Sequence, residues 1–212
     1  VDNYEDLPKK DKKPMMIVLD SLGMLSTSKE MTDTAEGKGT RDMTRAQMIK
    51  STFRVLTLKL GQAGIPMIMT NHTYDVIGSM FPTKQMSGGS GLFYAASTIV
   101  YLSRRKVKDG RDITGNIIHC KLYKSRLTKE NAQIDVHLDY KEGLHPYYGL
   151  VDLGIKYDIF KKVGNRIELP DGTKLYEKSL YKDARKYFTD DIMHQLDEAA
   201  NKELTYGNNE NN

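Results

Sequence analysis

The chain has 212 residues, which is enough for one sizeable core and a small second lobe. Hydrophobic residues make up 39% of it and charged residues 28%, and no apolar run approaches the roughly 18 residues that a membrane-spanning helix requires. These values exclude a membrane-spanning protein and predict a soluble globular one. The single cysteine, Cys120, has no partner for an internal disulfide, so we expect a reducing compartment, the cytoplasm.

The net charge of +4 is unevenly spread along the chain. From Arg104 to Lys129, nine basic residues stand against two acidic ones, a local charge of +7. From Tyr187 to Asn212, six acidic residues and one lysine give a local charge of −5. A polyanion would therefore be attracted to the middle of the chain and repelled by its end.

The first half of the chain alternates strand and helix signals. Residues 15–19 are a short apolar run that ends at Asp20, which predicts a central parallel strand. Residues 26–41 are polar and aperiodic, which predicts a long loop. Apolar residues then recur at steps of three and four from position 46 to position 60, which predicts an amphipathic helix that stops at Gly61 or Gly64.

A second apolar strand is predicted over residues 65–70, and it ends at Asn71 and His72. Open α/β sheets bind their ligands at such strand ends. Residues 73–91 predict a second long, glycine-rich loop that is mobile when nothing is bound. Strand-like runs at 98–102, 117–123 and 133–138 then predict antiparallel hairpins at the sheet edge.

The last third predicts a separate small lobe. It contains a predicted helix over 149–163, a hairpin turning at 170–172 and two short helices within 180–204. We therefore expect a core over residues 1–140, a small C-terminal lobe over 141–206 and a disordered tail over 207–212.

An apolar strand ending in Asp, here residues 17–21, is the Walker B pattern, whose carboxylate orders a magnesium ion near a nucleoside triphosphate. Taken alone, Asp20 more often caps the following turn. The Walker A pattern Gly-x-x-x-x-Gly-Lys-Ser/Thr is absent from the sequence, and residues 36–40 have its composition but not its order.

Asn71 and His72 are candidates for sensing a terminal phosphate through a hydrogen bond, although a lone histidine is more often structural. Metal binding is the weaker alternative, because no Cys or His lies at ligand spacing from His72.

Basic and aromatic side chains offer further candidates. Lys121, Lys124 and Arg126 are placed either to contact phosphates of DNA or of a neighbouring subunit's nucleotide, or to form a solvated strand face. Tyr74, Phe81 and Lys84, in the second loop, suit base stacking beside phosphate contacts, or else pack the loop.

The order of these features resembles that of the RecA-type recombinases. Residues 18–21 resemble the family's Walker B strand, 70–72 its strand ending in Asn-Gln, and 78–89 its second DNA-binding loop. Residues 124–126 resemble a Lys-Asn-Lys that reaches a neighbour's ATP, and 142–164 resemble its C-terminal lobe. Residues 20–23, 42–46 and 71–74 look closest to the phage UvsX recombinases, which have histidine where bacterial proteins have glutamine.

The resemblance implies an α/β fold with a RecA-like twisted, mainly parallel sheet, antiparallel edge strands, flanking helices and a small α+β C-terminal lobe. It implies an ATP-dependent homologous recombinase that forms filaments on single-stranded DNA and promotes strand exchange with double-stranded DNA. ATP and Mg²⁺ would be its cofactors. Phage-type loading and single-strand-binding proteins are expected partners, and the host cytoplasm is the expected location of a phage-encoded protein.

The resemblance also implies roles for individual residues. Asp20 would position magnesium through water, Ser21 and Asn71 would support the nucleotide, and His72 would sense its terminal phosphate. Lys124 and Arg126 would neutralise charge on the ATP of an adjacent subunit. The implied DNA contacts are Tyr74, Phe81, Lys84, Gly88 and Gly89.

Without a Walker A sequence, we expect the P-loop to lie upstream of Val1 and the chain alone not to hydrolyse ATP. Two alternatives stay open. One is a non-catalytic RecA-like paralogue that acts as a DNA-binding or regulatory module, and the other is a RecA-fold helicase motor.

Overall fold

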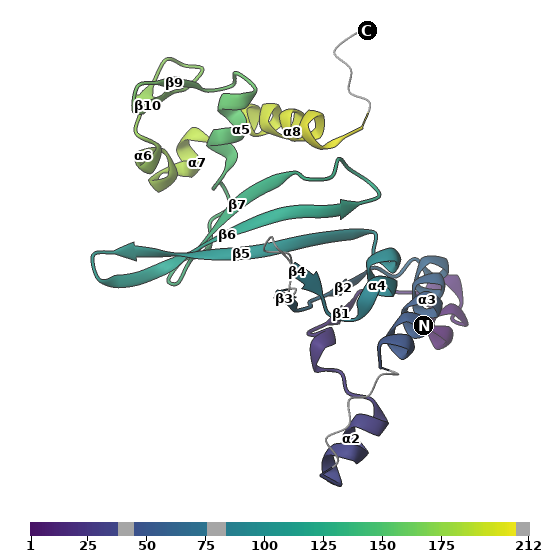
Figure 1. Ribbon diagram of the computed structural model, residues 1–212. Coiled ribbons are helices and arrows are strands. Elements are labelled where there is room, and N and C mark those ends of the chain that lie inside the picture. The colour runs from purple at the N-terminus through teal and green to yellow at the C-terminus, as the bar shows by residue number, and fades with distance from the viewer. Residues whose placement is uncertain (38–44, 76–83, 207–212) are drawn as a thin grey trace. The chain divides into compact units, whose positions relative to one another are not determined.

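The computed structural model describes residues 1–37, 45–75 and 84–206 (Figure 1). The chain divides into two compact units, Val1–Ala96 and Ser97–Asn212, which we describe separately. This division does not coincide with the predicted boundary between residues 140 and 141, which stays a prediction. The expected tail over 207–212 lies outside the described residues.

A parallel strand pair and one long helix organise the first unit. Strand β1 (Ile17–Leu19) runs parallel to β2 (Met67–Met69), with Val18 opposite Ile68. Both predicted apolar strands and their parallel pairing are thereby confirmed, although each is shorter than the apolar run that predicts it. The central position predicted for β1 stays a prediction, because β1 pairs only with β2 in the described part of the chain. The other elements are α1 (Asp2–Glu5), η1 (Lys9–Asp11), η2 (Leu22–Met24), α2 (Ser28–Ala35), α3 (Arg45–Ala63), β3 (Thr73–Asp75), β4 (Lys84–Met86) and α4 (Gly89–Ala95).

The apolar face of α3 forms the core of the first unit. Phe53 of α3 is buried in one cluster with Leu22 and Leu92. The helix passes through Gly61 and ends before Gly64, which has a φ of +65° and thus the left-handed conformation common at helix ends. The prediction of an amphipathic helix that stops at this glycine is confirmed.

Both predicted loops of the first unit contain regular structure. The prediction for residues 26–41 is wrong over 28–35, where α2 begins with a capping box between Thr27 and Glu30. The prediction for residues 73–91 is also wrong in part, because β3 and β4 pair as an antiparallel hairpin and α4 starts at Gly89. Residues 38–41 of the first predicted loop and 76–83 of the second lie outside the described residues.

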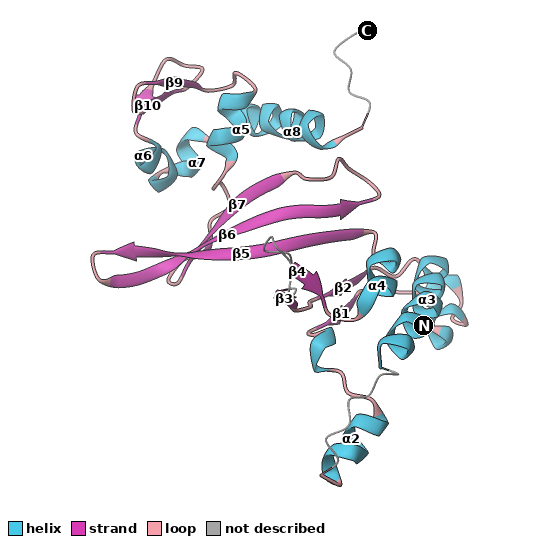
Figure 2. Cartoon of the chain, viewed as in Figure 1, coloured by secondary structure: helices cyan, strands magenta, loops and turns pink. Residues whose placement is uncertain are grey.

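The second unit begins with a four-stranded antiparallel sheet in the order β5-β6-β7-β8. Figure 2 shows β5, β6 and β7 of this sheet as neighbouring strands. Its strands are β5 (Thr98–Asp109), β6 (Asp112–Ser125), β7 (Gln133–Asp139) and β8 (Gly143–Leu144). The predicted antiparallel hairpins are confirmed. The strands β5 and β6 extend well beyond the apolar runs that predict them, because polar residues 103–109 and 112–116 continue the same ladder.

The C-terminal part of this unit has a core of its own, in which Val151, Phe160, Leu180 and Leu196 are almost fully buried. A small three-stranded sheet and several helices surround these residues. The elements are α5 (Leu150–Lys156), β9 (Lys161–Val163), β10 (Arg166–Glu168), β11 (Lys174–Leu175), α6 (Glu177–Lys182), α7 (Ala184–Tyr187) and α8 (Asp190–Leu204).

The prediction of a helix over 149–163 is wrong after residue 156. Asp158 takes a φ of +57°, and the amides of Ile159 and Phe160 both donate to the carbonyl of Gly154, at 2.9 and 3.0 Å. This fold-back places the Phe160 ring against Gly154, where a Cβ atom would lie 2.7 Å from Phe160 Cε2. A side chain at position 154 would therefore displace the most deeply buried ring of the lobe.

The hairpin predicted to turn at 170–172 is confirmed by the pairing of β10 with β11. The two short helices predicted within 180–204 are instead three in the described chain, since α6 starts at Glu177 and α7 precedes α8. Parallel and antiparallel strands combined with helices form an α/β fold, as predicted. None of the described helices combines the length and apolar character that crossing a membrane requires.

Candidate nucleotide and nucleic-acid site

Polar side chains meet where β1 and β2 end. Because the two strands are parallel neighbours, Asp20 and Thr70 lie side by side, and Thr70 Oγ1 donates to Asp20 Oδ1 at 2.5 Å. The amide of Thr70 donates to the carbonyl of Leu19 at 3.0 Å, and the peptide bond between Asp20 and Ser21 is cis. Asp20 Oδ1 thus holds the carboxylate at the strand end. The other oxygen, Oδ2, has no hydrogen bond to any of the described residues.

His72 lies next to Ser21 at the same sheet edge, with 3.4 Å between Ser21 Oγ and His72 Nε2. Gly23 makes this approach possible, because a Cβ on it would lie only 2.6 Å from His72 Cδ2. The intervening Leu22 is fully buried, and its amide donates to the Thr70 carbonyl at 3.1 Å. The segment after β1 is therefore fixed while its polar side chains stay at the surface.

Asn71 connects the end of β2 to the hairpin that follows it. Its side-chain Nδ2 donates to the Ser87 carbonyl at 2.8 Å, and the Ser87 amide donates to the His72 carbonyl at 3.0 Å. Its Oδ1 accepts from the His72 amide at 2.9 Å. Two hydrogen bonds thus join the strand end to Ser87 after β4, and the third orients the Asn71 side chain within the strand end.

A cavity of about 320 Å³ lies beside this hairpin, and we call it the hairpin cavity. It contains the predicted DNA-contacting residues Tyr74, Gly88 and Gly89 in its wall. Tyr74 is 53% exposed, and Lys84 lies opposite Asp75 in the register of β3 and β4. The complete lining is Arg45, Ala46, Ile49, Tyr74, Gln85, Met86, Ser87, Gly88 and Gly89. Phe81 lies outside the described residues.

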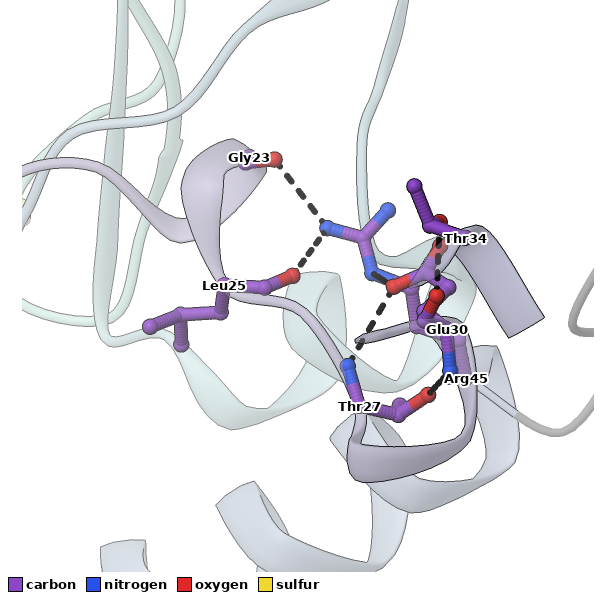
Figure 3. A network of polar contacts seen from close by, with 6 residues as sticks. All are labelled: Gly23, Leu25, Thr27, Glu30, Thr34 and Arg45. Atoms are coloured by element: carbon purple, nitrogen blue, oxygen red, sulfur yellow. Dashed lines mark hydrogen bonds and ion pairs between the residues drawn. The ribbon is translucent and has the colours of Figure 1, made fainter. Parts of the chain in front are cut away.

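Arg45, which is one of the residues that line the hairpin cavity, was not among the site residues predicted from the sequence. Figure 3 shows its contacts: Nη2 donates to the carbonyls of Gly23 at 3.1 Å and Leu25 at 2.8 Å, and Nε lies 3.8 Å from Glu30 Oε2. A signal was present, because Thr27 followed three residues later by Glu30 is the sequence pattern of a capping box. That pattern predicts a helix where we expected only a loop.

Lys124 and Arg126 lie at the end of β6, in the second unit. Lys124 faces Ile99 of β5, and the Arg126 amide donates to the Ser97 carbonyl at 3.0 Å. Burial, followed by the adjacent Arg126 charge, lowers the pKa of the Lys124 ammonium. Two neighbouring cations on a fixed strand end suit a polyphosphate. They belong to a different unit from Asp20, Ser21, Asn71 and His72, so each group is described by itself.

The turn after β6 is anchored to the last helix. Ser125 Oγ accepts from the amides of Leu127 and Thr128, at 3.1 and 2.9 Å. The Lys129 amide donates to the Leu204 carbonyl at 2.8 Å, and Lys129 Nζ contacts the Lys202 carbonyl at 3.4 Å. A lysine at the C-terminal end of α8 satisfies carbonyls that the helix leaves unpaired.

The residues at the strand ends suit a hydrated magnesium ion. In the described parts of the chain, no cluster of three or more His, Cys, Asp or Glu side chains is found that would enclose a metal. Magnesium keeps several waters and takes one or two carboxylates together with substrate phosphates. Asp20, with one oxygen committed to Thr70, fits that requirement.

The model of the RecA N-terminal domain family matches residues 10–145. The recombination and repair protein of Enterobacteria phage T4 is 36% identical over 151 residues, which are 71% of this chain and 38% of that protein. Protein RecA of Francisella tularensis subsp. novicida (strain U112) is 32% identical over 153 residues, 70% of this chain and 42% of that protein. The matched region thus spans about two fifths of these relatives. The predicted resemblance is confirmed, and the chain belongs to the RecA N-terminal domain family.

Proposed function

We propose that this chain is the part of an ATP-dependent homologous recombinase that orders magnesium, senses the terminal phosphate and contacts DNA. The observation that carries the proposal is the network at the ends of β1 and β2. There an acid, a hydroxyl, an imidazole and an amide meet at one sheet edge and are hydrogen-bonded onward to the hairpin. Such an edge is where open α/β sheets bind ligands.

In this proposal Asp20 holds magnesium through water, and bound magnesium neutralises charge on the phosphates. Ser21 and Asn71 support the nucleotide side of the site. His72 senses the terminal phosphate in this proposal, and the hydrogen bond from the Ser87 amide to its carbonyl supports transmission of that signal to the hairpin. A small displacement of the histidine would move the end of the β3–β4 hairpin. Lys124 and Arg126 act on the ATP of an adjacent subunit in the complete protein.

DNA is proposed to contact the hairpin cavity. Tyr74 presents an exposed ring for stacking, and Arg45 in the cavity lining supplies positive charge. The exposed Lys84 adds a second positive charge next to the lining residue Gln85. Gly88 and Gly89 have φ values of +88° and +73°, so their backbone adopts a shape that side-chain-bearing residues resist. Nothing lies within 4 Å of where a Cβ on Gly89 would be, which leaves that position open to a sugar-phosphate chain, whereas Gly88 packs against Leu22.

The wider activity is also a proposal. The complete protein would form filaments on single-stranded DNA, exchange strands with double-stranded DNA, and work with loading and single-strand-binding proteins. The Walker A sequence is absent here, so we propose that the chain alone has no appreciable ATPase activity. Turnover by the pure chain that disappears in Asp20→Ala would contradict this.

The test of DNA binding is fluorescence anisotropy with a labelled single-stranded oligonucleotide, at low and high salt, with and without ATP and magnesium. We expect binding that weakens as salt rises, because phosphate contacts release counterions, and that is indifferent to ATP. Lys84→Gln should weaken it. Lys59→Gln, which removes the same charge from a lysine paired with Asp2, is the matched control. Binding that ignores salt, or equal losses in the two variants, would contradict the proposed site.

A further inference from the structure

Helix α2 is held to the rest of the first unit by few contacts. None of its residues is buried, and Met31 is 65% exposed. Its first turn is ordered by the capping box, in which Glu30 Oε2 accepts from the Thr27 amide at 3.2 Å and the Glu30 amide donates to Thr27 Oγ1 at 3.1 Å. Segments with so little burial open at low free-energy cost.

The same carboxylate oxygen, Glu30 Oε2, also faces the Arg45 guanidinium. The separation of 3.8 Å from Arg45 Nε is an ion pair but too long for a hydrogen bond. Arg45 Nε is buried and has no hydrogen-bond acceptor among the described atoms. An acceptor that approached to normal hydrogen-bond distance would therefore satisfy a donor that Glu30 leaves unsatisfied.

Arg45 has contacts other than Glu30 that would hold it if Glu30 moved away. Its Nη2 is bound to the carbonyls of Gly23 and Leu25, which belong to the segment after β1 and not to α2. Arg45, a residue of the hairpin cavity lining, would thus keep these contacts, while its Nε faces the α2 carboxylate (Figure 3).

We infer that Glu30 is an autoinhibitory contact that occupies Arg45 in the place of a nucleic-acid phosphate and is displaced when a single strand enters the hairpin cavity. A carboxylate and a phosphodiester both offer anionic oxygens to a guanidinium, so they compete for it. This inference rests on the proposed DNA binding at the hairpin cavity. It adds that a carboxylate of the same chain, Glu30, competes with DNA for Arg45.

Glu30→Gln is a sharp test, because glutamine also serves in a capping box and only the charge is removed. The probe is a labelled single-stranded oligonucleotide at low salt. A partly exposed ion pair is weak, so we expect Glu30→Gln to tighten binding about two- to fivefold. We also expect a steeper salt dependence, by about 0.7 in the logarithmic slope for one more phosphate contact.

The control is Asp6→Asn, which removes one negative charge at the end of α1. Helix α1 is tied by Asp2 to Lys59, about 21 Å along α3 from Arg45. A nonspecific charge effect would change both variants alike. In an Arg45→Gln background, Glu30→Gln should have no more effect than the control.

The outcomes separate the two proposals. If the unaltered chain fails to bind the oligonucleotide at low salt, both the proposed function and the inference fall. If it binds, but Glu30→Gln binds no tighter than Asp6→Asn or retains its effect without Arg45, the inference alone is overturned.

Discussion

Gly154→Ala tests the packing of the C-terminal lobe, because helix propensity and packing predict opposite signs. Alanine is favoured over glycine inside a helix by about 1 kcal/mol. At position 154, however, the new methyl would lie 2.7 Å from Phe160 Cε2, and Phe160 is only 1% exposed. The ring would have to move by about 1 Å in a filled core, which costs about 1 to 3 kcal/mol or more. We expect a net destabilisation of about 1 to 2 kcal/mol.

The assay is urea unfolding followed by circular dichroism, with amide hydrogen exchange of α8 to assign the change to the lobe. With a typical slope of about 2 kcal/mol/M, the lobe midpoint should fall by about 0.5 to 1 M. Gly61→Ala in α3 is the matched control, because nothing lies within 4 Å of its new methyl. It should stabilise the first unit by up to about 1 kcal/mol. A stabilised Gly154→Ala variant would refute the packing argument.

Three further predictions follow from single contacts. Gly23→Ala should push the His72 ring about 1 Å away and shift the NMR resonance of its Cδ2 proton. The stability cost should stay below about 1 kcal/mol because the ring is exposed. An unmoved resonance would contradict this. Asn71→Ala should speed amide exchange in β4 about fivefold through the loss of one anchoring hydrogen bond, and unchanged exchange would exclude that role. The Lys156 ammonium, with other donors, lowers the pKa of Glu203 below 4.5, so its stabilisation is complete above pH 4.5 and is lost as pH falls through the folded-state pKa. Glu203→Gln should flatten stability in that acidic range, and an unaltered pH profile would argue against this pair.

The two strands could be predicted from their apolar runs, and the long helix could be predicted because its periodicity coincides with the burial of Phe53 and Leu60. Residues 17–19 and 67–69 are apolar runs that pair in a parallel sheet, and the 3.6-residue pattern from 46 to 60 places Phe53 in the core. Asp20 and His72 could be selected because polar residues at the ends of such strands must lie at one sheet edge.

The missed elements are those that local composition does not distinguish from loops. Helix α2 has no buried residue and is specified by its cap, and the β3–β4 hairpin has only three residues in each strand. The end of α5 depends on Phe160, which folds back onto a carbonyl six residues earlier. Arg45 was missed for a related reason, since its partners lie 15 to 22 residues away in a segment predicted to be a loop.

The two hydrogen bonds of Lys129 attach the turn after Lys124 and Arg126 to the last turn of α8. That turn is itself held to α5, because Glu203 accepts from Lys156 Nζ and from the Tyr157 hydroxyl. A tilt of α8 would carry the backbone at residue 129, three residues beyond Arg126. A displacement of the last turn of α8 would therefore reach the backbone beside Arg126 through the two Lys129 contacts.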